Sequence, residues 1–513
     1  MMRAGSRFER AGAPLAALLA ACVSLPGLWF PFLSDDWAVV ESVAGALPYR
    51  TAFYDFRPVF MASFWLERTL WGVSAAGSHV TNILLIAASA WLVVVLARRY
   101  GFAPHTAALA GGLFALHPYH VECAAMAGAR TDPLFSVPYL LAALLYDRWR
   151  VRRRFIPLGA MALFQVSLLS KETAGSFPAF VILVGLLDRR RRAGRGEWLR
   201  GYLPLIAQAL AHFLLLRTWA LGGFGRTLTH SFGLRWLKDA AGYAVAAVLP
   251  ADPATLAARP VLWAALAALL LAVLVAIAWA RSGSPPVPAL ACASGFVVLL
   301  GPSIVGFEER YMFLAGAASA LALAILITGA RGKLAAALGI ALAVGWGGAT
   351  AVEWRNWAEA ATASRRLVSD LVQASQDRTV NEIVVANMPL TIRGGSVAGD
   401  LRAAIALSGG RPVPVRAAAY FAYASATEDA FDGPLSRAVR LPPPRAEIRF
   451  RVRKAPFAHF VPEAGQRRGG VVESKAGRVD YDPASGLVIV SIPPSGEQRR
   501  AFVWAGGRLV RVF

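Results

Sequence analysis

The feature that most restricts the fold of this chain is a series of apolar runs, each close to the length that crosses a lipid bilayer. A spanning helix needs about 20 apolar residues, and fewer if it packs inside a bundle, so the sequence predicts about eleven membrane-spanning helices. They are expected at residues 12–31, 79–97, 102–117, 133–147, 155–169, 174–187, 200–217, 261–280, 286–304, 312–329 and 333–350. The sequence therefore predicts a polytopic α-helical membrane protein.

Composition and charge placement agree with this interpretation. Of the 513 residues, 57% are hydrophobic and only 16% are charged, whereas about a quarter of a soluble domain is charged. The net charge of +22 does not indicate nucleic-acid binding, because the basic runs lie beside apolar segments. These basic runs occur in alternate loops between the predicted helices and so fall on one side of the membrane, which the positive-inside rule identifies as the cytoplasmic side. We expect the membrane to be a bacterial inner membrane. The acidic and histidine-bearing loops are then exterior.

The N-terminus has two interpretations. Three arginines precede an apolar core, as in a signal peptide, and residues 19–22 resemble a lipoprotein processing box that would lipidate Cys22. We favour a retained first helix with a cytoplasmic N-terminus, because the apolar run continues past Cys22 as far as Phe30. In both cases Asp35 and Asp36 end on the exterior side.

The chain changes character after about residue 357, where no apolar run of spanning length recurs. Residues 365–375 form an amphipathic pattern, and short strands are predicted at 382–389, 446–454, 486–494 and 499–513, the last a hairpin turning at Gly506-Gly507. The predicted domains are a transmembrane domain, residues 1–356, and a soluble α/β domain, residues 357–513, which an odd number of spans places outside. Residues 236–253 are expected to form an interfacial or re-entrant helix.

Ionisable residues gather at the exterior ends of the predicted helices, and such groups near membrane depth usually pair with each other or line a cavity. Asp35 and Asp36 stand side by side where the first helix leaves the lipid, although adjacent carboxylates repel. The candidate site residues are, in chain order, Asp35, Asp36, Arg57, His79, His117, His120, Glu122, Arg130, Asp132, Lys171, Glu172, Glu309 and Arg310.

These residue types suit a group transfer in which a hydroxyl loses a proton and a phosphate departs. An aspartate can accept the proton as a general base. Arginine, lysine or protonated histidine can stabilise the leaving phosphate, and we select Arg130 and Lys171 for that role, with His117 and His120 assisting. A phosphate tethered to a lipid would enter from the bilayer.

Each cluster also has a structural explanation. The aspartates could mark a solvated loop, His117 could end a helix, and Lys171-Glu172 could be a local ion pair at the interface. A divalent metal ion held by His117, His120 and Glu122 stays an alternative, although their spacing matches no standard metal motif. Three isolated cysteines indicate neither a disulfide framework nor a cysteine metal site.

Several segments, in order, resemble the GT-C class of membrane glycosyltransferases: "DDW", "RPVF", "WLERTLWG", "GSHVTNILL", "FALHPYHVECAAMAGARTDPLF", "LLSKETAGSFP" and "EERYMFLAG". The sequence is most similar to bacterial relatives of the transmembrane-and-TPR protein O-mannosyltransferases over roughly its first 350 residues. We expect no TPR array of that family, and the predicted C-terminal α/β domain would stand in its place.

The resemblance implies an enzyme that moves a sugar, such as mannose, from a polyprenyl-phosphate carrier to an extracytoplasmic glycan, lipid or protein acceptor. Asp35 and Asp36 would be its catalytic acidic motif, and the other candidate residues would line the donor and acceptor site. The alternative from a different class is a non-catalytic transporter or envelope-assembly scaffold that handles lipid-linked glycans. A transporter predicts an inverted repeat with mid-helix binding residues, and the sequence shows neither.

Overall fold

The computed structural model describes residues 7–45, 56–152, 155–187, 195–221, 234–249, 259–282, 287–300, 308–392, 395–397, 399–423, 438–440, 446–451, 460–462, 466–468, 471–473, 478–482, 487–492, 499–505 and 507–511. The chain forms two compact units. The first contains Met1–Leu28 and Thr51–Glu353, and the second contains Trp29–Arg50 and Trp354–Phe513. We call them the helical unit and the α/β unit and describe each by itself.

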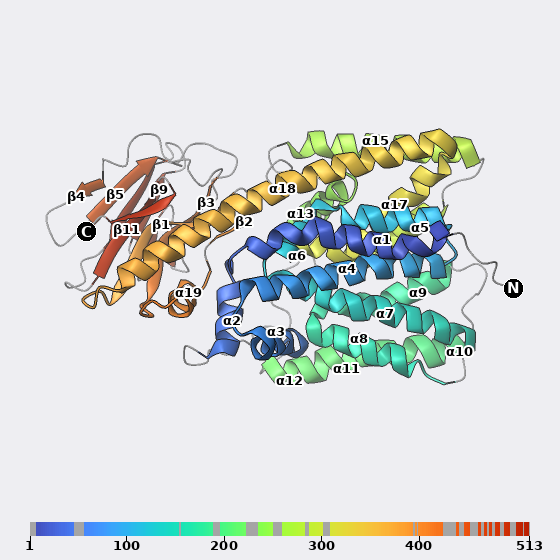
Figure 1. Ribbon diagram of the computed structural model, residues 1–513, viewed down its shortest axis with the longest axis horizontal. Coiled ribbons are helices and arrows are strands. Elements are labelled where there is room, and N and C mark those ends of the chain that lie inside the picture. The colour runs from blue at the N-terminus through green and yellow to red at the C-terminus, as the bar shows by residue number, and fades with distance from the viewer. Residues whose placement is uncertain are drawn as a thin grey trace. The chain divides into compact units, whose positions relative to one another are not determined.

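In the part of the chain that the structure describes, each expected apolar run is mainly helical (Figure 1). The α-helices of the helical unit are α1 (Arg7–Ser24), α3 (Pro58–Trp71), α4 (Ala75–Arg99), α5 (Pro104–Ala115), α6 (Val121–Ala125), α7 (Thr131–Arg152), α8 (Leu158–Ser170), α9 (Phe177–Leu187), α10 (Arg195–Glu197), α11 (Leu203–Ala211), α12 (Thr218–Leu221), α13 (Leu234–Ala246), α15 (Pro260–Ser282), α16 (Val287–Leu300), α17 (Met312–Gly329) and the first part of α18 (Gly332–Ser375).

Six helical stretches of the described chain are long and apolar enough to cross a membrane, fewer than the eleven expected. They are Ala11–Trp29, Ala75–Arg99, Trp198–Leu221, Val261–Arg281, Glu309–Gly329 and Gly332–Ser375. Trp198–Leu221 contains two π-helical turns, Trp198–Tyr202 and His212–Arg217. In the described residues, the other expected spans form shorter or more polar helices, such as α5 with 12 residues and α8 with 13; residues 301–304 of the span expected at 286–304 lie outside the described residues. The chain is thus a multi-pass helical membrane protein with a C-terminal sheet region.

Small residues let the first helices of this unit pack closely. A Cβ atom on Gly111 of α5 would overlap side chains of Val94 from α4 and Ala16 from α1. Gly12 likewise faces Ala108 across the α1–α5 interface. Close backbone approach through small residues is the usual packing mode of membrane helices, since burial of apolar surface gives little advantage inside lipid.

Ion pairs fix the two ends of α7. At its C-terminal end Arg99 of α4 pairs with Asp147 at 2.5 Å, and Arg150 pairs with Glu197 at 2.6 Å. At its N-terminal end Asp132 pairs with Lys171 at 2.6 Å. Asp132 and Arg150 are 18 residues apart on one helix, which at about 1.5 Å per residue is about 27 Å. That spacing is close to the hydrocarbon thickness of a bilayer.

Helix α18 differs from the sequence prediction. A span at 333–350 and a separate amphipathic helix at 365–375 were expected, yet one continuous helix of 44 residues, Gly332–Ser375, contains both. The residues between them include Ala, Glu, Trp and Arg, with neither Gly nor Pro between 349 and 375, so nothing local ends the helix. The part from Trp354 onward belongs to the α/β unit.

The α/β unit contains two sheets. The first has the strand order β12-β11-β1-β3-β6, with β2 pairing β1, and the second has the order β4-β5-β10-β9-β8-β7. The elements are α2 (Asp36–Ala44), β1 (Glu382–Ile392), β2 (Gly395–Ser396), α19 (Leu401–Leu407), β3 (Val415–Tyr423), β4 (Ala438–Arg440), β5 (Ala446–Arg451), β6 (Phe460–Pro462), β7 (Gln466–Arg468), β8 (Val471–Glu473), β9 (Arg478–Asp482), β10 (Leu487–Ile492), β11 (Arg499–Ala505) and β12 (Arg508–Arg511).

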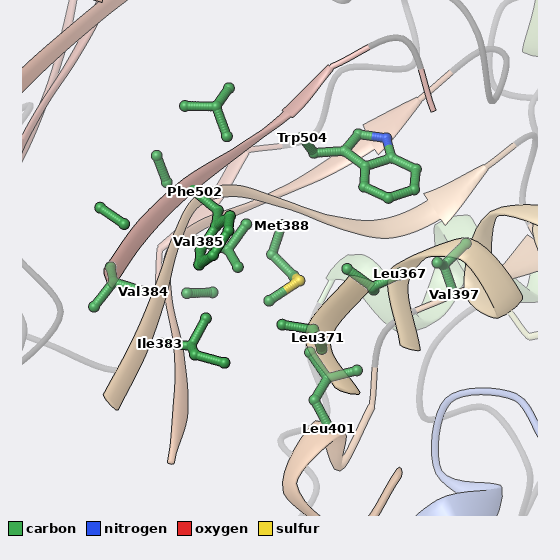
Figure 2. Close-up of a cluster of buried hydrophobic side chains, with 14 of the residues drawn as sticks. Leu367, Leu371, Ile383, Val384, Val385, Met388, Val397, Leu401, Phe502 and Trp504 are labelled. Atoms are coloured by element: carbon green, nitrogen blue, oxygen red, sulfur yellow. The ribbon is translucent and has the colours of Figure 1, made fainter. Parts of the chain in front are cut away.

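Strand β1 is the centre of the first sheet and runs parallel to both β3 and β11. Helix α18 contributes Leu367 and Leu371 to a buried cluster that also contains Met388 of β1 and Trp504 of β11 (Figure 2). The buried amide of Asn387 bonds both to the backbone N–H and to the carbonyl of Trp504, each at 2.8 Å, and so continues the β1–β11 ladder. The predicted C-terminal hairpin is confirmed, because β11 and β12 pair antiparallel.

Candidate functional site

A buried ion pair lies at the centre of the polar cluster in the helical unit. The Nζ atom of Lys171 donates to both carboxylate oxygens of Asp132 at 2.6 Å, and both side chains are at most 3% exposed. Lys171 follows the last residue of α8, and Asp132 lies in the first turn of α7. The ammonium group also lies 4.5 Å from the ring centre of Tyr311. Two segments distant in sequence are thereby held together by opposite charges.

The second part of the cluster surrounds Arg310. Its Nη1 atom lies 2.9 Å from Glu122, whose other oxygen accepts from the Arg310 backbone N–H at 2.8 Å. Arg310 also pairs with Glu308. Burial raises the pKa of the Glu122 carboxyl to about 7, although the charge of Arg310 acts in the opposite direction. The Arg310 side chain is 20% exposed, so this part of the cluster reaches the surface of the unit.

The third part is a carboxylate shared by two arginines. Arg57 donates to both oxygens of Glu172, at 3.0 and 2.6 Å, and the guanidinium of Arg217 lies 3.5 Å from the same group. Two positive charges therefore face one negative charge. The Arg57 side chain is 21% exposed, whereas that of Arg217 is 7% exposed. Guanidinium groups such as these can also make paired hydrogen bonds to a phosphate.

Arg130 is held differently, because it is fully buried and surrounded by protein partners. It pairs with Glu67 at 2.8 Å and donates to Asn82 and to the Ser78 carbonyl, each at 2.9 Å. Asn82 in turn donates to the carbonyls of Cys123 and Met126. His79 bonds to the Ala124 carbonyl at 2.9 Å through Nδ1. These contacts fix the segment between α5 and α7 on helix α4, an arrangement that indicates a structural role for Arg130.

His117 and His120 form a buried aromatic cluster. Their rings stack at 5.2 Å between centroids, and Trp346 packs edge-on against His117 at 4.8 Å. Burial lowers the pKa of His117 to about 3, and burial together with His117 lowers the pKa of His120 well below its ordinary value. Both imidazoles are therefore neutral at pH 7. Nδ1 of His117 accepts from the Tyr119 N–H at 3.3 Å, and Nε2 has no hydrogen-bond partner among the described residues.

Asp35 and Asp36 lie in the α/β unit and have unequal environments. Asp36 is fully buried, and its Oδ2 atom accepts from the Leu33 backbone N–H at 2.9 Å. Asp35 immediately precedes α2 and is exposed. The two adjacent carboxylates thus differ in environment: that of Asp36 is bonded inside the turn, and that of Asp35 lies on its surface.

The helical unit brings together most of the residues selected from the sequence. Arg57 meets Glu172, Asp132 meets Lys171, and Glu122 meets Arg310, while His79 and Arg130 position the loop that carries the histidines. Glu309 is buried at the start of the turn Glu309–Tyr311. Sequence reasoning missed three partners: Glu67, Arg217 and Tyr243, whose hydroxyl bonds to the backbone of Glu308. The one signal that the sequence offers for these three residues is an ionisable or phenolic side chain.

Among the described residues, no group of three or more His, Cys, Asp and Glu side chains is placed so that it could hold a metal ion. His117 and His120 stack face to face, and the carboxylate of Glu122 is bonded to Arg310 instead of pointing at them. The three residues proposed above as metal ligands are therefore engaged separately in this structure.

No family model matches the chain. Protein O-mannosyl-transferase Tmtc1 of Drosophila melanogaster is 36% identical over 141 residues, which cover 27% of this chain and 16% of that protein. Protein O-mannosyl-transferase Tmtc2 of the same species is 33% identical over 182 residues, which cover 30% and 19%. Human protein O-mannosyl-transferase TMTC4 is 33% identical over 114 residues, which cover 20% and 15%. The chain is thus similar to protein O-mannosyl-transferases over part of its length, and it spans less than a fifth of each of these relatives.

Proposed function

We propose that the chain is a membrane glycosyltransferase that moves a sugar, mannose in the first instance, from a polyprenyl-phosphate donor to an acceptor hydroxyl on the extracytoplasmic side. One observation carries this proposal. The segments that resemble O-mannosyltransferases supply most of a cluster of ion-paired side chains at one end of the helical unit. In this cluster Glu172 is shared by Arg57 and by Arg217, which lies outside those segments. Charged groups are costly at membrane depth and are usually functional there.

The geometry favours Arg57, assisted by Arg217, over Arg130 and Lys171 as the phosphate-binding group. Every guanidinium nitrogen of Arg130 has a protein partner, and Lys171 is closed off by Asp132 and Tyr311. Arg57 is partly exposed, and its carboxylate partner Glu172 is also attracted by Arg217. A phosphate could therefore bind Arg57 while Glu172 keeps its contact with Arg217.

The proposed reaction is a direct displacement with inversion. The acceptor oxygen forms a bond to the anomeric carbon while the bond from that carbon to the phosphate oxygen breaks. The acceptor proton passes to Asp35, and the departing phosphate keeps the bonding electron pair, stabilised by the arginine charge. Asp36 orients the turn through its bond to the Leu33 N–H. This assigns Asp35 as the base and Asp36 as the residue that positions it.

The first test is a comparative glycan and lipid profile by mass spectrometry in a strain that lacks the gene. The strain is complemented with wild type, Asp35→Asn or Asp36→Asn at matched membrane levels. Deletion should remove one defined glycoconjugate, and Asp35→Asn should lower its formation by about 10²–10⁴-fold, the usual contribution of a general base. Full restoration by both Asn variants would exclude a catalytic role of the aspartates and favour the transporter or scaffold alternative.

A second test addresses the donor. Purified protein is assayed with synthetic polyprenyl-phosphate-mannose, with polyprenyl-phosphate-glucose and with GDP-mannose. Arg57→Lys should raise the KM for the lipid-linked donor, because a lysine cannot make the same two-point contact with phosphate. Equal KM values for Arg57→Lys and wild type would contradict the assignment of Arg57.

A further inference from the structure

The turn with the two aspartates is part of the α/β unit, although more than 300 residues separate it from the rest of that unit in sequence. Trp29–Arg50 forms one compact body with Trp354–Phe513. We propose that the C-terminal α/β unit positions the Asp35–Asp36 turn, and that Arg365 and Gly399 are positioning residues for it. This inference rests on the proposed function for its catalytic meaning, but the anchoring itself can be measured independently.

The first anchor lies where the chain enters the turn. The guanidinium of Arg365, on the C-terminal part of α18, donates to the carbonyl of Trp29. One residue later, the ring of Phe30 packs edge-on against Trp354 of the same helix, at 5.6 Å between centroids and an interplanar angle of 84°. Helix α18 therefore holds both the backbone and a side chain of the approach to the turn.

The second anchor lies at the turn itself. Ser34 has φ +45°, a left-handed conformation that is unfavourable for a residue with a Cβ and persists only where its surroundings impose it. The backbone of Gly399 lies directly against Ser34, so that a Cβ atom at position 399 would overlap the Ser34 carbonyl. Glycine is therefore required at 399 by the close approach of the two backbones.

The segment that carries Gly399 is itself fixed on α18. The hydroxyl of Ser364 bonds to the carbonyl of Val397 at 3.3 Å, and Gly395 lies against Ala360. The chain then enters α19, whose N-cap Asp400 accepts from the Ala403 N–H at 3.1 Å. Helix α19 packs against α2, the helix that begins at Asp36 (Figure 1).

These contacts explain why the aspartates differ. Within the turn the Asp36 N–H bonds to the Leu33 carbonyl at 2.9 Å, and the Asp36 side chain returns to the Leu33 N–H. Phe32 packs against Trp37 across the same turn, at 5.5 Å between ring centroids. The closed turn buries Asp36 and leaves Asp35 on its surface. Loss of an external anchor should therefore disorder the presentation of Asp35 without removing any group that touches the substrate.

The test is hydrogen–deuterium exchange of the purified full chain in detergent, read on peptides that cover residues 30–44. Arg365→Ala should raise exchange of the amides of residues 33–37 by about tenfold, as expected for loss of one charged hydrogen bond. Arg366→Ala, which removes the neighbouring exposed arginine of the same helix, is the matched control and should leave exchange unchanged. Arg365→Lys should restore most of the protection, and Gly399→Ala should repeat the effect from the other side of the turn.

The same variants are assayed for transfer. Arg365→Ala and Gly399→Ala should lower kcat by about tenfold or more with little change in the donor KM, whereas Arg366→Ala should behave as wild type. Raised exchange in a preparation whose wild type transfers no sugar from any donor supports the anchoring and overturns the proposed function instead. Unchanged exchange in both Arg365→Ala and Gly399→Ala overturns the inference, whatever the activity, and so does an equal kcat loss in Arg366→Ala.

Discussion

At the scale of single residues, the site shows how costly charges are retained in an apolar protein. Asp132 and Lys171 are both buried, and each supplies the charge that the other needs. Removing water from one ion costs several kcal/mol even after the surroundings relax, so a buried ion without its partner is strongly unfavourable. The pair therefore contributes more to specifying which segments meet than to the net stability of the fold.

Neutralising one member of this pair should destabilise the helical unit. Asp132→Asn leaves the Lys171 ammonium buried without a counter-charge and should cost about 3–5 kcal/mol. The double variant Asp132→Asn, Lys171→Met should recover much of this loss. As a control, Glu359→Gln removes a carboxylate from the partly exposed pair Arg355–Glu359, whose side chains are 75% and 25% exposed, and should cost less than about 1 kcal/mol. Thermal unfolding of the full chain in detergent measures all three variants, and an Asp132→Asn variant as stable as wild type would contradict the prediction.

The buried histidines predict a pH dependence of stability. The pKa of His117 is lowered by burial to about 3, whereas an unfolded histidine titrates near 6.5. The unfolded chain therefore binds the proton first, so this contribution to stability is complete above about pH 6.5 and falls as the pH drops toward 3. Each such histidine removes about 1.4 kcal/mol per pH unit in that window.

The variant His117→Asn isolates this contribution, because asparagine can still cap the turn Pro118–His120 but does not titrate. Unfolding temperatures measured between pH 7 and pH 5 should decline less steeply in His117→Asn than in wild type. Superimposable pH profiles would show that His117 is not buried as a neutral group in the folded protein.

At the scale of elements, the sequence predicted what local patterns determine. Apolar runs became helices, the pattern at residues 382–389 became the central strand β1, and residues 499–513 became the hairpin β11–β12. The length of α18 escaped prediction because its middle was interpreted as a domain boundary, although no helix-breaking residue occurs there. Hydropathy predicts whether a segment lies in lipid or in water. Where a helix ends depends instead on glycine, proline and capping residues.

Pairings between distant elements could not be predicted from one sequence. The sequence identified Glu172 and Arg130 as candidates, but not that Arg217 would share the first or that Glu67 would bury the second. The placement of the Asp35–Asp36 turn in the α/β unit is of the same kind. These contacts depend on chain topology, and residue type and spacing carry no information about which of several arginines lies opposite a given carboxylate.

At the scale of the whole molecule, the two ends of α7 define two polar layers of the helical unit. One layer contains Arg99, Asp147 and Arg150 and lies next to arginine runs of the sequence. The other layer contains Asp132 and Lys171 and belongs to the candidate site. Their separation of about 27 Å along α7 fits opposite faces of a membrane. The positive-inside rule then predicts that the site layer is extracytoplasmic.

The side of the membrane that each unit occupies can be measured with single cysteines. In a background without Cys22, Cys123 and Cys292, the exposed positions Gly196 and Thr362 are each replaced, giving Gly196→Cys beside the arginine run and Thr362→Cys on the α/β unit part of α18. A membrane-impermeant maleimide should label Thr362→Cys in right-side-out vesicles and Gly196→Cys only in inside-out vesicles. Labelling of Thr362→Cys only in inside-out vesicles would place the α/β unit in the cytoplasm, where an extracytoplasmic acceptor could not reach the Asp35–Asp36 turn.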